Sequence, residues 1–182
     1  SIIADPRNPE MQSKLNQKIK FRESFRPFAP SVLAEKQQQY FQIDAASPYM
    51  LMVAQTQKNI RTPDSDQAMA DRTGIDKLYC PRSTLPAITH VDYSARLQTV
   101  SQATNPRYHQ LLTAFEQRSG CAVLINTSFN VRGEPIVCSP ADAFRCFINT
   151  DMDCLIINNF VLKKHQQNQQ GSSDFKQQFA AD

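Results

Sequence analysis

The sequence predicts an α/β fold. Short apolar or alternating segments typical of strands recur along the chain, and stretches with apolar residues at helical spacing lie between them. The 182 residues, of which 41% are hydrophobic and 20% charged, are enough for one domain with a core and too few for two. We expect residues 1–164 to form this domain and the glutamine-rich residues 165–182 to be a disordered polar tail.

The N-terminal half predicts short elements separated by prolines. Met11 and Leu15 lie four residues apart behind a proline, as in a short helix, and alternation from Ile19 to Arg22 is typical of a strand. In order, we expect a helix at 9–18, a strand at 19–22, a proline-rich loop to residue 33, a helix at 34–42, a buried strand at 49–54, and an excursion or mobile loop at 55–86.

The C-terminal half carries clearer boundary signals. Asn105 and Pro106 are typical of a helix start and Gly120 of its end, and Ser139-Pro140 repeats the start signal further on. In order, we expect a strand pair or one bent strand at 87–100, a helix at 106–119, a strand buried on both faces at 121–125, a helix at 140–147, and a hairpin of 154–157 and 160–162.

Charge and composition exclude several classes of protein. The 20 Lys and Arg against 17 Asp and Glu give a net charge of +3, far below the excess of a dedicated nucleic-acid binder. No run approaches the ~18 apolar residues of a membrane helix and no secretory leader is present, so we expect a soluble, cytoplasmic protein. The opening Ser1-Ile2-Ile3, without a methionine, suggests a chain cut from a longer one.

The five cysteines are odd in number and contain no CxxC pair. Most lie in apolar or periodic surroundings, which favours reduced, buried thiols over disulfides or metal ligands. The cysteines are Cys80, Cys121, Cys138, Cys146 and Cys154.

Three cations within seven residues form the first candidate site. Alternation would aim Lys20 and Arg22 at one side of the predicted strand, with Arg26 following in the loop. An arginine fork binds phosphate or carboxylate oxygens in pairs, while lysine acts as a mobile point charge, so these residues can hold a polyanion. The alternative is a solvated strand face with Glu23 as a neighbour.

Polar residues at the carboxyl end of the predicted strand 121–125 form the second candidate site. Open α/β sheets bind ligands at this position. Thr127, Ser128 and Asn130 can donate hydrogen bonds to phosphate oxygens, Arg132 adds a charge, and Gly133 permits close approach of the backbone. The alternative is a turn that satisfies only its own backbone.

His90 and Asp92 would share one face of a strand, and Arg96 is a further candidate for binding an anion. A lone His-x-Asp pair is a weak signal, and structural hydrogen bonding competes with catalysis for His90. Only three histidines are present, so we expect no protein metal cage.

Several long motifs together resemble the C-terminal domain of the O-carbamoyltransferases, which carbamoylate nodulation factors and antibiotics. The resemblance extends from residue 1 to about Lys164. Tyr93 stands where that family more often has a small residue, so the loop after Asp92 is where the geometry is expected to differ. The motifs are Ile19 to Pro30, His90-Val91-Asp92, Arg96 to Val100, and Asn126 to Val137.

The resemblance implies a YrdC/Sua5-like fold, a twisted mixed sheet with flanking helices. That fold has a Lys-x-Arg pair and a Ser-x-Asn pair in one basic cavity, which Lys20-Phe21-Arg22 and Ser128-Phe129-Asn130 match. The two candidate sites are thereby implied to be two halves of one site. Lys20, Arg22, Ser128 and Asn130 are the implied catalytic residues. Binding of ATP or carbamoyl phosphate is expected of Arg26, His90, Arg96, Thr127 and Arg132.

The implied reaction forms carbamoyl-adenylate from carbamoyl phosphate and ATP, with Mg²⁺ accompanying the nucleotide. In the family, a Kae1-like N-terminal domain with an iron site then transfers the carbamoyl group to a hydroxyl on a small-molecule acceptor. That domain is absent from this chain, and Ser1 to Arg7 resembles the junction just after it. The metal sites are therefore expected elsewhere, and we expect neither a membrane nor a nucleic acid as partner.

Two other functions remain open. The first is an RNA-binding or interaction module without catalysis, because a basic cavity can accept a nucleic-acid backbone. The second is a threonylcarbamoyl-adenylate synthase. A net charge of +3 without a basic stripe argues against the RNA-binding module. The Arg-Pro-Phe-Ala-Pro motif at 26–30 and the His-Val-Asp motif at 90–92 favour carbamoyl transfer over the synthase.

Overall fold

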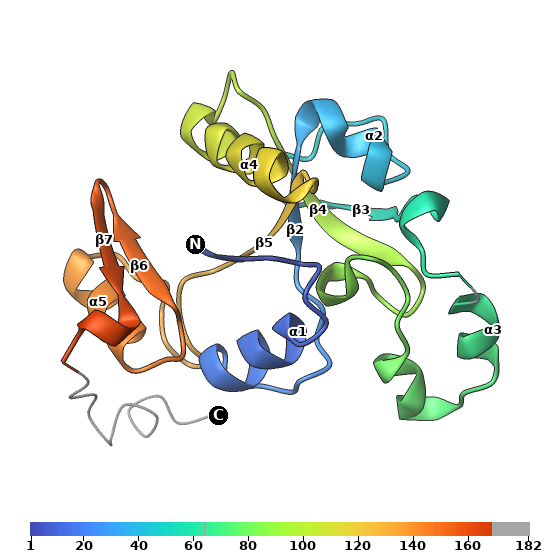
Figure 1. The fold of residues 1–182 in the computed structure, drawn as a ribbon, viewed down its shortest axis with the longest axis horizontal. Coiled ribbons are helices and arrows are strands. Elements are labelled where there is room, and N and C mark those ends of the chain that lie inside the picture. The colour runs from blue at the N-terminus through green and yellow to red at the C-terminus, as the bar shows by residue number, and fades with distance from the viewer. Residues whose placement is uncertain (64, 169–182) are drawn as a thin grey trace. The chain divides into compact units, whose positions relative to one another are not determined.

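A five-stranded mixed sheet flanked by helices is the largest element of the structure, which confirms the predicted α/β class. The computed structural model describes residues 1–63 and 65–168 (Figure 1). Most of the predicted tail, residues 169–182, lies outside the described residues. The chain divides into unit 1, made of residues 1–12 and 25–127, and unit 2, made of residues 13–24 and the chain from Ser128 onward. Composition did not indicate this division.

Unit 1 is built on the five-stranded sheet, in the order β1-β5-β2-β4-β3. The strands β2 and β4 are parallel, and the other neighbours are antiparallel. Central position explains why β5 is apolar throughout its first three residues, as the sequence predicted. The strands are β1 Ile2–Ala4, β2 Pro30–Leu33, β3 Met52–Gln55, β4 Ser94–Val100 and β5 Val123–Thr127.

The long helix α4, Pro106–Ser119, packs on β2 and β5 (Figure 1). Its start and end are those predicted: the Asn105 side chain accepts a hydrogen bond from the backbone N–H of Tyr108, and Gly120 follows with φ +72°. A buried apolar cluster joins this helix to the sheet. Its members are Leu33, Val100, Leu112, Ala122 and Leu124, with Tyr40, Tyr108 and Phe115 packed around them.

The rest of unit 1 consists of short helices. The predicted helix at 34–42 is confirmed as a 3₁₀ turn followed by α2. Residues 55–86, predicted as an excursion or mobile loop, instead contain α3 and two 3₁₀ turns. The helices are α2 Gln37–Tyr40, α3 Ser65–Ala70, and 3₁₀ turns at Ala34–Lys36, Lys58–Ile60, Gly74–Tyr79 and Pro86–Ile88.

Two strands of unit 1 differ from the prediction. The strand β2 lies inside the segment that was predicted to be a proline-rich loop. A proline can begin a strand, because the residues after it supply the backbone N–H groups for pairing, and Pro30 is the first residue of β2. The strand β3 was predicted to be buried but forms the edge of the sheet, with Val53 61% exposed. An apolar run of this length does not reveal whether one face or both faces are covered.

Unit 2 contains the helix α5 and a two-stranded hairpin, which lie side by side in Figure 1. The hairpin was predicted, and its turn places Asn158 at φ +53°. A π-helix continues directly from α1, whose first two residues belong to unit 1. The elements are α1 Met11–Lys14, the π-helix Leu15–Ile19, α5 Pro140–Ile148, β6 Cys154–Ile157, β7 Phe160–Lys163 and a 3₁₀ turn at Lys164–Gln166.

Both ends of α5 are closed by side chains. At its start Ser139 accepts from the N–H of Asp142, and the Asp142 carboxylate accepts from the N–H of Ser139, which forms a reciprocal capping box. At its end the Lys164 ammonium donates to the carbonyls of Phe147, Ile148 and Thr150. These carbonyls would otherwise lack helix partners.

The predicted strand at 19–22 is wrong. Ile19 ends the π-helix, the N–H of Lys20 donates to the carbonyl of Leu15 at 2.8 Å, and Phe21 has φ +50°. Lys20 and Arg22 are therefore not aligned on one face of a strand. Alternation over four residues cannot distinguish a strand from a helix end when the apolar residues also match the helical face of Leu15.

The cysteines are all reduced but not all buried. Cys80, Cys121 and Cys146 are buried, as predicted, whereas Cys138 and Cys154 are exposed. Cys138 precedes α5, and Cys154 begins the exposed side of the hairpin. Cys154 has apolar neighbours in the sequence, which predicted burial, but it lies on the face of β6 that is exposed to solvent.

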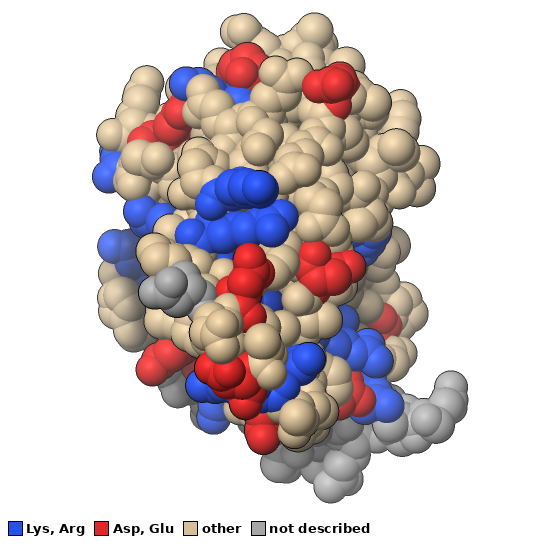
Figure 2. All heavy atoms as spheres, turned by 90° about the vertical axis from the view of Figure 1, so that its right-hand side faces the viewer, with Lys and Arg blue, Asp and Glu red and all other residues tan. Residues whose placement is uncertain are grey.

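The surface mixes charges of both signs. On the face shown in Figure 2, Lys and Arg side chains gather in small groups with Asp and Glu between most of them, and the described residues form no continuous basic stripe across it. No helix among the described residues is both long and apolar enough to cross a membrane.

Candidate functional site

Lys20 lies at the centre of a polar cluster within unit 2. The residue is only 5% exposed, and its ammonium nitrogen donates to the carbonyl oxygen of Ser128 and to three further oxygens. These are Ser128 Oγ at 3.1 Å, Asn130 O at 3.0 Å and Asn130 Oδ1 at 2.9 Å. The structure therefore brings together the lysine of the Lys-x-Arg motif and both polar residues of the Ser-x-Asn motif, which are more than 100 positions apart.

The π-helix Leu15–Ile19 positions the lysine. Each π turn adds a residue relative to an α turn, and such turns are frequent at functional sites. Phe21, which directly follows Lys20, has φ +50°. This is the left-handed region, where the backbone of any residue other than glycine is strained. Together these two features reverse the chain immediately after Lys20.

Asn16 fixes the other half of the Lys-x-Arg motif. It is fully buried, its Oδ1 accepts from Arg22 Nε at 2.7 Å, and its Nδ2 donates to the carbonyl of Ser24 at 3.1 Å. The backbone N–H of Arg22 also donates to the carbonyl of Asn16 at 3.0 Å. The sequence analysis missed Asn16. Its position between the apolar Leu15 and Ile19 on a short helix was the available signal.

A tight turn presents Ser128 and Asn130. The chain leaves β5 at Thr127, and Gly133 adopts φ +76° so that residue 134 can fold back. Asn130 Nδ2 donates to the carbonyl of Glu134 at 2.8 Å, and Ser128 Oγ donates to Asn130 Oδ1 at 2.6 Å. Ser128 is exposed whereas Lys20 is buried, so the serine hydroxyl is the outermost polar group of the cluster.

The surroundings of Lys20 lower the pKa of its ammonium group. Burial, and secondarily the positive charge of Arg22, lower the pKa of Lys20 to about 8. Glu134, which the sequence analysis did not select, acts in the opposite direction. The ammonium therefore predominates at neutral pH, and the neutral amine forms as the pH rises through about 8.

The remaining predicted residue of unit 2 is Arg132. It is exposed on the same turn, two residues after Asn130. A cation at this place can meet an anion that approaches the cluster from solvent.

The other predicted residues belong to unit 1. Arg26 is exposed in the segment before β2, and Thr127 is the last residue of β5, paired with Ile2. The predicted strand face for His90 and Asp92 is wrong, because both lie in the turn before β4 and the N–H of Tyr93 donates to the carbonyl of His90.

Around this turn each group has a local role. Asp92 accepts from the backbone and the hydroxyl of Ser94 at 3.0 and 2.6 Å, and Arg96 donates to the carbonyl of Met50 at 3.1 Å. Desolvation lowers the pKa of His90, and the charges of Arg82 and Arg96 act in the same direction, so the ring is neutral at pH 7.

Tyr93 has φ +62°, in the left-handed region that favours glycine, and its side chain is held by two contacts. The hydroxyl donates to Ser65 Oγ at 2.9 Å, and the Arg61 guanidinium lies 4.3 Å from the centre of the ring.

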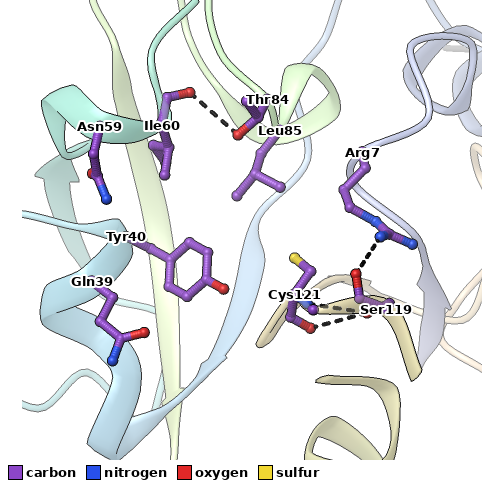
Figure 3. Close-up of a pocket in the computed structure, with 10 residues that line it drawn as sticks. Arg7, Gln39, Tyr40, Asn59, Ile60, Thr84, Leu85, Ser119 and Cys121 are labelled. Atoms are coloured by element: carbon purple, nitrogen blue, oxygen red, sulfur yellow. Dashed lines mark hydrogen bonds between the residues drawn. The ribbon is translucent and has the colours of Figure 1, made fainter. Parts of the chain in front are cut away.

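A separate cavity of about 300 Å³ lies within unit 1 (Figure 3). Part of its polar lining is engaged with the protein. Arg7 donates to the carbonyl of Ser119 at 2.7 Å and is paired with Asp5, and the Tyr40 hydroxyl accepts from the backbone of Ala122. Gln39 and Asn59 also line the cavity. The cluster around Lys20 is the better candidate, because it joins residues of both predicted sites.

Comparison with known proteins shows to which family the chain belongs. The sequence profile described as Carbamoyltransferase C-terminus matches residues 1–164. The chain belongs to this family. Among its relatives, an uncharacterized protein of Synechocystis sp. is 62% identical over 93% of the chain, and nodulation protein NolO of Bradyrhizobium diazoefficiens is 39% identical over 90%. The 3'-hydroxymethylcephem-O-carbamoyltransferase of Amycolatopsis lactamdurans is 36% identical over 75% of the chain.

The matched region is one part of these carbamoyltransferase-family proteins. The chain covers 27% of the length of the first two relatives and 22% of the third, so it spans about a quarter of each. The match of residues 1–164 includes Lys20, Arg22, Ser128 and Asn130.

Proposed function

We propose that this chain forms carbamoyl-adenylate from carbamoyl phosphate and ATP, as the YrdC-like, cytoplasmic part of an O-carbamoyltransferase. The observation that carries the proposal is the cluster in which the Lys20 ammonium meets Ser128 and Asn130. Membership of the carbamoyltransferase C-terminus family supports the same conclusion. Residues 1–164 form the YrdC-like region in this proposal.

The reaction consumes water and releases two phosphate products. Water hydrolyses carbamoyl phosphate to carbamate and inorganic phosphate. A carbamate oxygen then attacks the α-phosphorus of ATP, the bond from that phosphorus to the bridging oxygen of the β-phosphate breaks, and pyrophosphate leaves. Negative charge grows on the α-phosphoryl oxygens and on the leaving group, so catalysis requires fixed positive charge and hydrogen-bond donors.

Lys20 and Arg22 supply the positive charge. Lys20 is held by protein oxygens before any substrate arrives, so little reorganisation is needed when an anion binds beside it. Asn16 Oδ1 accepts from Arg22 Nε and so fixes the position of the guanidinium group.

Ser128 and Asn130 orient the substrates. The exposed Ser128 hydroxyl donates to Asn130 Oδ1, and rotation about its Cβ–Oγ bond allows it to donate to a phosphoryl oxygen instead. Lys20 continues to hold Asn130 during this exchange. We assign binding of a phosphate of ATP or carbamoyl phosphate to Arg132, which is exposed on the same turn as Asn130.

Metals and partners complete the proposal. Mg²⁺ accompanies ATP in this proposal, bound to the phosphates of the nucleotide. The iron site is assigned to a Kae1-like domain, as the family resemblance implies. There the carbamoyl group would pass to the hydroxyl of a small-molecule acceptor.

The test measures carbamoyl-phosphate-dependent exchange of labelled pyrophosphate into ATP with the intact protein, as its native gene encodes it. Lys20→Met and Ser128→Ala are expected to lower kcat/KM by about 100-fold or more, as loss of one transition-state donor does. Lys18→Met is the matched control, since Lys18 is exposed on the same helix and is expected to leave the rate within twofold.

Ser128→Ala keeps the lysine and its other oxygen partners, so it tests the site even where Lys20→Met fails to fold. Full activity in a folded Lys20→Met protein would show that the site is wrongly assigned. Exchange that requires threonine and bicarbonate instead of carbamoyl phosphate would indicate a threonylcarbamoyl-adenylate synthase.

A further inference from the structure

Glu134 is a buried acidic residue beside the cluster around Lys20. Its side chain is 2% exposed, and burial of an acidic group is costly unless the surroundings use the charge. The carboxylate lies between the turn that carries Asn130 and the helix α5, where Arg145 Nη2 is 3.5 Å from Glu134 Oε1. No described hydrogen-bond donor satisfies Oε1.

Glu134 closes the turn through three of its atoms. Its carboxylate Oε2 accepts from the backbone N–H of Val131 at 3.1 Å, and its own N–H donates to the carbonyl of Val131 at 3.2 Å. Its carbonyl accepts from Asn130 Nδ2 at 2.8 Å. The turn is therefore braced on both sides of Asn130.

This brace determines what Asn130 offers to Lys20. Because the amide nitrogen of Asn130 donates to Glu134, the amide oxygen must face the opposite way. There it accepts from both the Lys20 ammonium and the Ser128 hydroxyl. The orientation of one amide thus links Glu134 to both proposed catalytic groups.

The charge of Glu134 also acts on Lys20. The groups that influence the ammonium are Arg22, Cys146 and Glu134, and Arg22 opposes the charged form. Burial and the neighbouring Glu134 raise the pKa of the Cys146 thiol to about 12, so the thiol is neutral at physiological pH. Glu134 is then the acidic group that balances the two cations.

We propose that Glu134 is a positioning residue for adenylate formation, which braces the Asn130 turn and supplies the negative charge that balances Lys20 and Arg22. This inference rests on the function proposed above. A carboxylate that faced an anionic substrate would repel it. The proposed role explains why a buried acidic residue lies beside a site for anionic substrates.

Two substitutions separate the brace from the charge. Glu134→Gln retains an oxygen that can accept from Val131 but removes the charge, whereas Glu134→Asp retains the charge on a shorter side chain. Without the charge, Lys20 becomes neutral at a lower pH than in the wild type. The ammonium needed for anion binding is then lost earlier as the pH rises.

The experiment measures ATP affinity by calorimetry and kcat/KM for pyrophosphate exchange in the intact protein, from pH 6 to 9. In Glu134→Gln we expect both to decline at lower pH than in the wild type, with ATP affinity reduced about tenfold at pH 8 and less than twofold at pH 6. Glu134→Asp should follow the wild-type pH profile. The matched control is Asp153→Asn, which removes an exposed carboxylate paired with Lys14 in the same unit.

A Glu134→Gln protein with the wild-type pH profile would overturn the proposal. A pH profile unchanged in shape but lowered throughout would indicate a structural role only, and would overturn it as well. The ATP measurement needs no turnover. A wild-type protein that binds ATP but catalyses no exchange would therefore contradict the proposed function, while the shift in binding still decides the role of Glu134.

Discussion

A lysine that is 5% exposed loses most of its hydration, and Lys20 compensates with four oxygen acceptors. The compensation is incomplete, since the pKa of Lys20 falls to about 8. A depressed lysine pKa means that the buried ammonium destabilises the fold most below pH 8, and that this cost is relieved as the proton leaves. The site therefore keeps a charge that costs folding free energy, which is typical of a functional group.

Thiol reactivity follows from burial at the same scale. Thiolates are the reactive species, and the buried Cys80, Cys121 and Cys146 are shielded, with burial raising the pKa of the last two. Cys138 and Cys154 are exposed. We expect iodoacetamide at pH 8 to alkylate these two in the native protein within minutes and the other three at least about tenfold more slowly, as measured by peptide mass spectrometry.

Denaturation in urea is the control, and should make the five rates similar. Rapid alkylation of Cys146 in the native protein would contradict the packing of Glu134 and α5 around it.

At the scale of single elements, the capping box of α5 is the clearest contribution to stability. Ser139→Ala removes the hydroxyl that accepts from the N–H of Asp142 and is expected to destabilise the protein by about 1 kcal/mol. Asp142→Ala is also expected to destabilise the protein, and the double variant by less than the sum of the two single variants, because both hydrogen bonds belong to one box. Urea denaturation followed by circular dichroism measures these differences.

Thr73→Ala serves as the control, since Thr73 is exposed at the start of a 3₁₀ turn and its side chain makes no capping hydrogen bond. Strict additivity of Ser139→Ala and Asp142→Ala would show that the two hydrogen bonds are independent.

The elements with local signals were predicted correctly. The helix α4 has Asn105, Pro106 and Gly120 at its ends, and α5 has Ser139 and Pro140, so a few neighbouring residues determine where each begins or ends. The strand β5 was evident because it is apolar on both faces.

The wrong elements depend on distant contacts. The strand β2 forms because β4 and β5 pair with it on either side, although it opens with Pro30. The turn at Lys20 is stabilised by Ser128 and Asn130, which accept hydrogen bonds from its ammonium. A pattern of four alternating residues cannot predict contacts with residues more than 100 positions away. Propensity is overruled at these places by tertiary structure.

At the scale of the whole molecule, the charge distribution and the salt dependence of binding distinguish a nucleotide-binding protein from a nucleic-acid-binding one. A net charge of +3 and mixed signs on the face in Figure 2 provide no extended track for phosphates. Between 50 and 200 mM salt we expect ATP affinity to fall less than about tenfold, whereas a protein that contacts six or more phosphates loses about 1,000-fold or more. Calorimetry with ATP and with a single-stranded RNA 20-mer measures both.

Saturable ATP binding that the RNA fails to displace at 150 mM salt would support the nucleotide site. Tight RNA binding with a steep salt dependence would instead favour the RNA-binding module.

The candidate site was predictable in its members more than in its geometry. Lys20, Arg22, Ser128 and Asn130 were found because family motifs mark them, and the structure places the lysine on the serine and the asparagine. The supporting residues Asn16 and Glu134 were missed. Their importance lies in burial and in the orientation of one amide, and neither can be read from a run of residue types.

The separation of Lys20 from Ser128 has a consequence during synthesis. The two residues are 108 positions apart, and a ribosome adds about 5–20 residues per second. The lysine therefore leaves the exit tunnel roughly 5–20 s before the oxygens that will bind it. For that interval the nascent chain carries Lys20 and Arg22 without the oxygens of Ser128 and Asn130, so the cluster can form only after residue 130 has been synthesised.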